Sequence, residues 1–176
     1  MSSRAADRHT DRPSRRRQQR RPCYPARTLH LIDIENLAGT ARPDRHQVRA
    51  LYAMYCLRVG LGAMDQVVVA SSELTIRNAG HCWPGARCLV RSGPDGADLE
   101  LLAVIEQERV AERFTHVAIA SGDGIFTSAA AGLAAAGCQV TVVSRRAGLS
   151  RRLALLAASR VIYLDVALAA ATRSVA

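Results

Sequence analysis

The stretch LHLIDIENL at Leu29–Leu37 and the stretch VAIASGDGIF at Val117–Phe126 decide the fold. Each begins as a short, largely apolar run and reaches an aspartate, Asp33 in the first and Asp123 in the second. Runs of this kind are typical of strands that are covered on both faces, as in a parallel sheet. The two stretches therefore predict buried strands that carry acidic side chains at their carboxyl ends.

Along the rest of the chain, short apolar runs alternate with longer helical patterns. This alternation indicates βαβ units around a parallel sheet. We predict strands at Thr28–Ile34, Gln66–Ser71, Arg87–Arg91, Thr115–Ala120, Gln139–Ser144 and Arg160–Leu164. The expected fold is an α/β, Rossmann-like three-layer domain with a central, mostly parallel sheet of five to six strands. If the strand order is 3-2-1-4-5, the first and fourth strands are neighbours.

Four helical patterns separate these strands. They begin at Pro43 and Asp44, near Pro94 and Asp95, directly after Asp123, and after Ser150. The second is expected to continue to about Arg113, with Leu99 and Leu102 on its apolar stripe. The third is alanine-rich and stops at Gly137, which we expect to be a left-handed cap.

The bulk composition suits one domain. The chain has 176 residues, and 49% of them are hydrophobic, which is enough for a sizeable core. No apolar stretch reaches the length of a membrane helix, and the N-terminus lacks the apolar centre of a secretory signal. We therefore expect a cytoplasmic protein with no membrane partner.

The formal charge of +9 is concentrated in the first residues. Residues 1–27 hold nine arginines and two aspartates, and so carry +7 of it. They are too poor in apolar residues to bury a core, so we expect a disordered arginine-rich tail followed by a single domain over 28–176. The tail is either an arm that binds RNA phosphates, a solvated segment, or the product of a start codon assigned too early.

The five cysteines are scattered along the chain, and we expect no disulfide framework. His81, Cys82 and Cys88 crowd what is expected to be one loop around Trp83 and Pro84. A Cys-x-x-Cys pair and an evident fourth ligand are missing from this loop, which favours an ordinary structured loop over a zinc site.

Three aspartates fall where the predicted sheet would bind a ligand. Asp33 and Asp123 end neighbouring strands, and Asp98 begins the helix after the third strand in GPDGADLELL. Ligands of open α/β sheets bind beyond the carboxyl ends of the strands. Carboxylates gathered there repel one another unless a cation neutralises them. The pattern predicts a site for Mg²⁺ or Mn²⁺, a chemistry that suits hydrolysis of phosphodiesters.

The alternative is that these aspartates only cap helices. Asp or Ser at a strand-to-helix junction often accepts hydrogen bonds from free backbone amides. Asp33 is harder to explain in this way, because an acid directly after the apolar run Leu29–Ile32 is costly to place without a purpose.

The segments LIDIENL, GADLELL and SGDGIF, in this order, resemble three motifs of the NYN family of the PIN-like nuclease superfamily. The resemblance spans roughly His30 to Leu164. It implies a PIN-like form of the Rossmann fold and a metal-dependent ribonuclease that acts in RNA processing or decay. By position it also implies that Asp33, Asp98 and Asp123 are the metal ligands and catalytic acids, with Asn36 as the polar residue beside them.

One position departs from the pattern. Many members of this family carry a second aspartate two residues after the aspartate of SGDGIF, and this chain has Ile125 there. Either Glu35 or Asp95 supplies the missing carboxylate, or the metal binds more weakly, or catalysis is lost. Glu35 is therefore a further candidate catalytic residue.

The candidate substrate contacts are glycines and arginines on the same edge. Glycines beside Asp123 would let a phosphate approach the backbone, and arginines after the third and fifth strands could hold RNA phosphates. These residues are Gly122, Gly124, Arg91, Arg145 and Arg146. Solvated loop arginines are the alternative. Trp83 and Phe126 are the only aromatic candidates for stacking outside the expected core, so base-specific recognition is not predicted.

The expected function is thus an endoribonuclease that acts on single-stranded or structured RNA, with a homodimer as an open possibility. The alternative is a PIN-like module that binds RNA or protein without catalysis, in keeping with Ile125 and the basic tail. A dinucleotide-binding domain is disfavoured because LIDIENLAGT has one glycine where the fingerprint has three. A phosphoacceptor receiver domain is disfavoured because the chain has no lysine.

Overall fold

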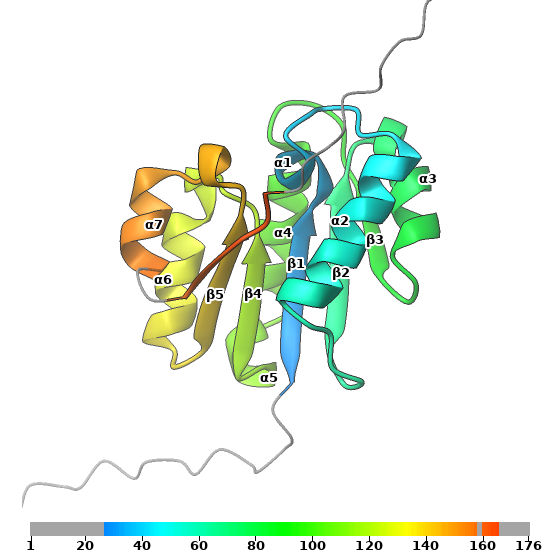
Figure 1. Ribbon diagram of the computed structural model, residues 1–176. Coiled ribbons are helices and arrows are strands. Elements are labelled where there is room, and N and C mark those ends of the chain that lie inside the picture. The colour runs from blue at the N-terminus through cyan, green and yellow to red at the C-terminus, as the bar shows by residue number, and fades with distance from the viewer. Residues whose placement is uncertain (1–26, 158–159, 166–176) are drawn as a thin grey trace, which may run out of the picture.

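The computed structural model describes residues 27–157 and 160–165, and its centre is a six-stranded sheet in which every neighbouring pair is parallel (Figure 1). The strands are β1 (Thr28–Asp33), β2 (Gln66–Ser71), β3 (Arg87–Val90), β4 (His116–Ala120), β5 (Gln139–Ser144) and β6 (Val161–Tyr163). Their order is β3-β2-β1-β4-β5-β6. The predicted α/β, Rossmann-like fold is confirmed, and the expected order is extended by a sixth strand.

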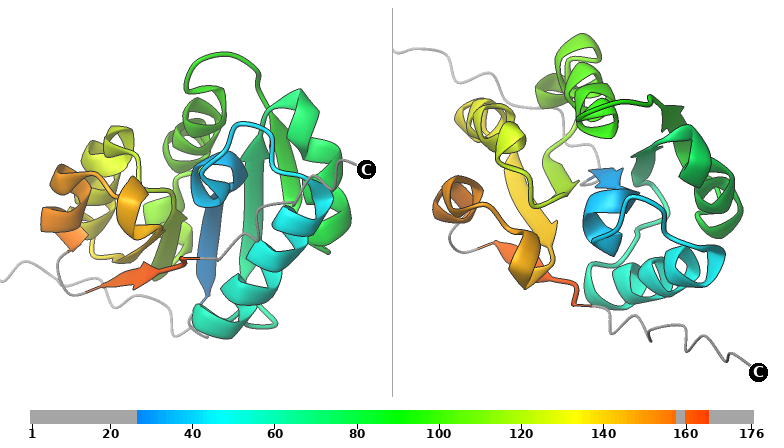
Figure 2. Two further views of the ribbon diagram at one scale, coloured as in Figure 1. Left: turned by 45° about the horizontal axis from the view of Figure 1, so that its top comes forward. Right: turned by 90° about the horizontal axis from the view of Figure 1, so that it is seen from above.

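Helices cover both faces of the sheet and make the three layers (Figure 2). One face carries α1 (Ile34–Ala38), α2 (Arg45–Arg58) and α3 (Glu73–Cys82). The other carries α4 (Gly96–Gln107), the short α5 (Val110–Arg113), α6 (Thr127–Ala135) and α7 (Arg151–Ala157). Two 3₁₀ turns, η1 (Gly124–Phe126) and η2 (Arg146–Gly148), precede α6 and α7. Within the described ranges, no helix has both the length and the apolar character needed to span a bilayer.

Alternate residues of each strand feed two separate cores. In β1, Leu29 and Leu31 lie in the core under α4, α6 and α7, whereas Ile32 lies in the core under α1, α2 and α3. Successive side chains of a strand point to opposite faces, so burial of both faces makes the whole run apolar. This is the physical reason for the continuous apolar runs in the sequence.

The register of β1 and β4 places two loops side by side. Ile32 pairs with Ala120, so Asp33, the last residue of β1, and Ser121, the first residue after β4, stand at the same level. The loop after β4 then carries Asp123. Parallel pairing therefore brings the two aspartates to one edge, as the strand order predicted.

The segment between β2 and β3 corrects one prediction. His81 and Cys82 belong to helix α3, and Cys88 lies in β3, so the three do not share a loop. Trp83 is only 2% exposed and packs edge-on against Tyr52 and Tyr55 of α2. Its assignment as a stacking residue outside the core is wrong.

Three further expectations need adjustment. Phe126 is fully buried, so it offers no stacking surface either. The helix after Asp95 ends at Gln107, because Arg109 adopts a left-handed backbone with φ +52° before α5 begins. Leu99 is 37% exposed and lies off the apolar stripe. The left-handed cap at Gly137 is confirmed, with φ +87°.

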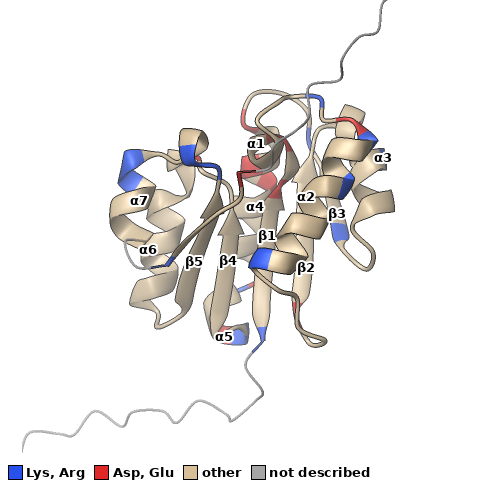
Figure 3. Ribbon diagram, in the orientation of Figure 1, with Lys and Arg blue, Asp and Glu red and all other residues tan. Residues whose placement is uncertain are grey.

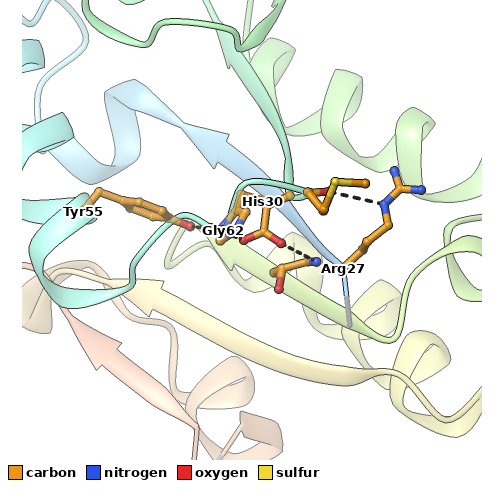
Figure 4. Close-up of polar contacts among 7 residues, drawn as sticks. Arg27, His30, Tyr55 and Gly62 are labelled. Atoms are coloured by element: carbon orange, nitrogen blue, oxygen red, sulfur yellow. Dashed lines mark hydrogen bonds and ion pairs between the residues drawn. The ribbon is translucent and has the colours of Figure 1, made fainter. Parts of the chain in front are cut away.

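A buried polar cluster fastens the amino end of the sheet, opposite the aspartates (Figure 4). His30 Nδ1 lies 2.8 Å from the Tyr55 hydroxyl, and His30 Nε2 lies 3.2 Å from Asp65 Oδ2. Asp65 also accepts hydrogen bonds from the backbone amides of Thr28 and Gly62. Burial lowers the pKa of His30 more than the neighbouring carboxylate raises it. Every polar atom of the His30 ring is thus satisfied, and the cluster is a structural one.

Candidate metal centre at the carboxyl edge

The motif that ends β1 sends three polar side chains to three different places. Asp33 caps α1, since its Oδ1 accepts from the backbone N–H of Asn36 at 3.0 Å. Glu35 Oε1 accepts from the backbone N–H and the hydroxyl of Ser72, at 2.9 and 2.6 Å, at the start of α3. Asn36 Oδ1 accepts from the backbone N–H of Gly122 at 2.9 Å, in the loop after β4. The motif therefore joins the loops after β1, β2 and β4.

Asp33 and Asp98 form a buried acidic pair. They are 4% and 6% exposed, and Asp98 lies in the first turn of α4. Burial raises the pKa of Asp33 to about 6. Burial, followed by the charge and hydrogen bonding of Asp33, raises the pKa of Asp98 to about 8. The two carboxyl groups thus share a proton near neutral pH, held mainly by Asp98.

One oxygen of this pair has no other partner. Asp98 Oδ1 is buried and has no hydrogen-bond partner within the described part of the chain. A buried polar atom without a partner is costly. Either a proton shared by Asp33 and Asp98 or a cation bound in its place would satisfy Asp98 Oδ1.

Asp123 acts on the pair through its charge. Its Oδ1 accepts from the backbone N–H of Ile125 at 2.9 Å, and its own N–H donates to Ser121 Oγ at 3.2 Å. The aspartate therefore caps η1, as the capping alternative expected. Its negative charge also contributes to the raised pKa of Asp98. The capping role and a place in the acidic site are thus compatible.

A divalent cation fits this site by its donor chemistry. In the ranges 27–157 and 160–165, no group of three or more His, Cys, Asp or Glu side chains is arranged so that it could hold a metal ion. The three predicted acids do not form such a group: Asp33 and Asp98 interact as a pair, and Asp123 acts on Asp98 through its charge. Mg²⁺ is usually held by one or two carboxylates and completes its shell with water and phosphate oxygens. Two carboxylates and an oxygen without a donor meet that requirement.

The position that departs from the NYN pattern is used for packing. Ile125 lies against the core between α4 and α6, so its side chain adds no ligand. Of the two acids that could replace the missing one, Glu35 has Oε1 bound to Ser72. Asp95 is exposed, and its charge contributes to the raised pKa of Asp98. Asp95 is thus the freer of the two.

The two predicted phosphate glycines differ in their surroundings. Gly122 is buried, its N–H is bound to Asn36, and an added Cβ would collide with Gly148 O and Ser144 Oγ. It serves a close approach of two loops rather than a ligand. Gly124 is half-buried, and an added Cβ would meet Ser150 Oγ at 3.2 Å. Gly124 is thus less crowded than Gly122, although Ser150 lies close to it.

The three predicted arginines also differ. Arg91 is exposed and lies 3.6 Å from Glu100. Arg146 is exposed, pairs with Asp165 at 3.1 Å, and lies over the ring of Tyr163. Arg145 is half-buried, and its Nε donates to the backbone carbonyl of Asn36 at 3.0 Å. Arg145 is therefore the one that the structure joins to the acidic motif.

Sequence reasoning missed the residues that hold this edge together. The backbone N–H of Ser72 donates a hydrogen bond to Glu35. Gly148 packs on Gly122, and Gly39 packs on Arg145. None belongs to a motif with a recognisable spacing, and each works through a backbone group or through the absence of a side chain.

Comparisons with known proteins bear on the fold. One solved structure with a similar fold is the crystal structure of a protein of unknown function from Vibrio parahaemolyticus. The TM-score is 0.55 at 18% sequence identity, and the match covers 80% of this chain and 93% of that chain. No family model and no curated protein matches the chain. Membership of the NYN family therefore stays a prediction.

Proposed function

We propose that this chain is a divalent-metal-dependent endoribonuclease of the NYN type, which hydrolyses RNA phosphodiester bonds at the carboxyl edge of its sheet. The observation that carries the proposal is the buried pair of Asp33 and Asp98, with raised pKa values and an oxygen that lacks a donor. Buried, mutually perturbed carboxylates in this position of an α/β fold are typical of functional sites. The three ordered motifs in the sequence support the same reading.

The roles of the acids follow from their contacts. Asp33 and Asp98 would hold Mg²⁺ or Mn²⁺, which when bound activates water and neutralises phosphate charge. Asp98 must first release its proton, because a protonated carboxyl is a poor ligand. The N–H of Asn36 fixes Asp33 Oδ1, so the Asp33 carboxylate would bind the metal without reorienting. Asp123 has Oδ1 fixed by a backbone amide, which leaves its other oxygen to hold a water.

Unpaired arginines flank the acidic centre on two sides. Figure 3 shows acidic segments at the end of β1 and the start of α4, with arginine segments on α7 and around the start of α2. The exposed arginines of these flanks are Arg42, Arg45, Arg151 and Arg152, and none forms an ion pair within the part of the chain that the structure describes. Arginines at the opposite end, by contrast, pair with Glu108 and Glu112.

The flanking arginines are not placed for helix stability. Arg45, Arg151 and Arg152 stand in the first turn of α2 or α7. A cation there opposes the helix dipole, which favours negative charge at the N-terminus. A polyanion laid across the carboxyl edge would meet positive charge on both sides of the acids. We assign these side chains to the RNA backbone.

The metal requirement tests this function. Labelled single-stranded and hairpin RNAs are incubated with the full chain and Mn²⁺, Mg²⁺ or EDTA, and RNA binding is measured under the same conditions. We expect cleavage with either metal and none with EDTA. Equal cleavage in EDTA, or no cleavage with either metal, would overturn the proposal.

A second candidate function is an RNA-binding or protein-binding module without catalysis. Two observations favour it: Ile125 packs in the core, and no group of three ligand side chains could hold a metal within the described residues. RNA binding that is independent of Mn²⁺, without cleavage, is the result that this candidate expects. The cytoplasmic location and the homodimer stay predictions from the sequence, and residues 1–26 of the predicted arginine-rich tail, 1–27, lie outside the described residues.

A further inference from the structure

Three loops interlock at the carboxyl ends of β1, β4 and β5. The loop after β4 contributes Gly122, whose carbonyl accepts from the backbone N–H of Ser150 at 2.8 Å. An added Cβ on Gly122 would collide with Gly148 O and with Ser144 Oγ. The β4 and β5 loops are therefore in direct backbone contact, and a change in one moves the other.

Arg145 fills the remaining gap, between the β1 and β5 loops. A Cβ on Gly39 would stand 2.5 Å from Arg145 Cζ, and a Cβ on Gly148 would stand 3.1 Å from its Nη2. The guanidinium thus lies against both glycines, and the left-handed backbone of Gly39, with φ +70°, ends α1 directly beneath it. Arg145 Nε donates to the carbonyl of Asn36 at 3.0 Å. Within residues 27–157 and 160–165, Arg145 has no acidic partner.

Asn36 links Arg145 to Gly122 through two hydrogen bonds. Its backbone carbonyl is bound by Arg145, and its side-chain oxygen binds the N–H of Gly122, next to Asp123. The chain of contacts runs from Arg145 through Asn36 to the aspartate of the β4 loop.

We propose that Arg145 is a positioning residue of the acidic site: it fixes the end of α1 so that Asn36 holds Gly122 and sets Asp123 relative to Asp33 and Asp98. The catalytic part of this inference rests on the proposed function. The planar guanidinium fits the slot between two glycines while donating sideways, which an ammonium group cannot do. This role differs from the contact with RNA phosphates that the position of Arg145 after β5 predicts.

The first test measures the hydrogen bond at the far end of the chain of contacts and needs no activity. Amide hydrogen exchange of Gly122 is followed by NMR in the full-length wild type, in Arg145→Ala and in Arg145→Lys. Arg58→Ala is the control, because it removes an exposed arginine at the C-terminal end of α2, away from the acidic site. We expect exchange at Gly122 to become about 10-fold faster or more in both Arg145 variants, while Leu31 in the core stays as protected as in the control. Unchanged protection of Gly122 overturns the proposal.

The second test separates positioning from substrate contact. With saturating Mn²⁺, we expect Arg145→Lys to lower kcat about 10-fold, with KM and the salt dependence of RNA binding unchanged. A raised KM with unchanged kcat in Arg145→Lys, or a salt slope reduced by about 0.7 in Arg145→Ala for one lost phosphate contact, overturns it. If the wild type cuts no RNA, the proposed function fails, and the exchange measurement still decides the role of Arg145. Arg145→Lys keeps the charge and the stem, so it serves where Arg145→Ala does not fold.

Discussion

The side-chain oxygen of Asn36 accepts a hydrogen bond from the backbone N–H of Gly122 at 2.9 Å, across 86 positions of the sequence. This bond joins Asn36, three residues after the β1 aspartate Asp33, to Gly122, the residue directly before Asp123. Because both aspartates lie within three residues of this bond, its loss should disturb the site more than the fold.

Asn36→Ala tests that expectation. We expect kcat to fall about 10- to 100-fold, the range for residues that orient catalytic or metal-binding groups. The free energy of unfolding should fall by only about 1 kcal/mol, the usual net worth of one hydrogen bond. Urea unfolding and steady-state cleavage measure the two quantities. A loss of stability that accounts for the whole loss of activity would contradict the orienting role.

The raised pKa values predict how metal binding depends on pH. Asp98, with a pKa of about 8, and Asp33, with a pKa of about 6, hold protons that a cation must displace. The affinity for Mn²⁺ should therefore rise as pH rises from 6 to 8, by about 10-fold per pH unit for one released proton, and level off above 8. Calorimetric titration in buffers of different ionisation enthalpy counts the proton. An affinity that is flat across this range, or proton uptake on binding, would sink the prediction.

The acidic pair also predicts how Asp98→Asn changes Mn²⁺ binding. Asp98→Asn removes the titrating carboxyl while keeping the shape of the side chain. Its Mn²⁺ affinity should be at least about 10-fold weaker than that of the wild type at pH 8, and its slope between pH 6 and 8 should be smaller. Asp44→Asn, at the exposed cap of α2 on the same edge, should leave both quantities unchanged.

The polar cluster at the amino end predicts a second pH dependence. Burial lowers the pKa of His30, so below pH 6.5 the unfolded chain binds a proton that the folded chain excludes. Stability from this group is present above pH 6.5 and is lost as pH falls toward the folded pKa. His30→Gln cannot take up the proton, so the difference in Tm between wild type and variant should shrink as pH falls from 7 to 5. A constant difference would mean that His30 has the same pKa in the folded and the unfolded chain, which would contradict this prediction.

The flanking arginines predict the salt dependence of RNA binding. Arg45→Ala and Arg151→Ala should each weaken binding and lower the slope of log Kd against log salt by about 0.7 for one single-strand phosphate. Arg58→Ala removes the same charge from the other end of the helix that begins with Arg45, and should change neither. Equal slopes for all three variants would show that the protein attracts RNA by its net charge alone.

Much of this architecture could be predicted from the sequence, because burial on both faces leaves a clear mark. The strands Gln66–Ser71 and Gln139–Ser144 were placed to the residue. Helix α3 was missed because its buried positions are Thr75, Ala79 and Cys82, which are too small and polar to form an apolar stripe. Its largest apolar residue, Leu74, is 66% exposed.

The acids of the site could be predicted, and the contacts that position them could not. An aspartate directly after an apolar run is conspicuous, since burying it has a cost. The contact of Arg145 with Gly39 joins residues 106 positions apart, and it depends on a backbone turn and on a missing side chain. No sequence pattern carries that information. For the same reason, the sequence predicts a substrate contact for Arg145, because its position after the fifth strand is the only information available.

Comparison of the wild type with Asp33→Asn tests most directly whether the acidic pair cuts RNA. Cleavage of a labelled RNA is measured with saturating Mn²⁺ under single-turnover conditions, with Asp44→Asn as the control and urea unfolding as the check on the fold. The account predicts a loss of about 100-fold or more in Asp33→Asn, with the fold and RNA affinity retained, and full activity in the control. Full activity in Asp33→Asn would contradict it.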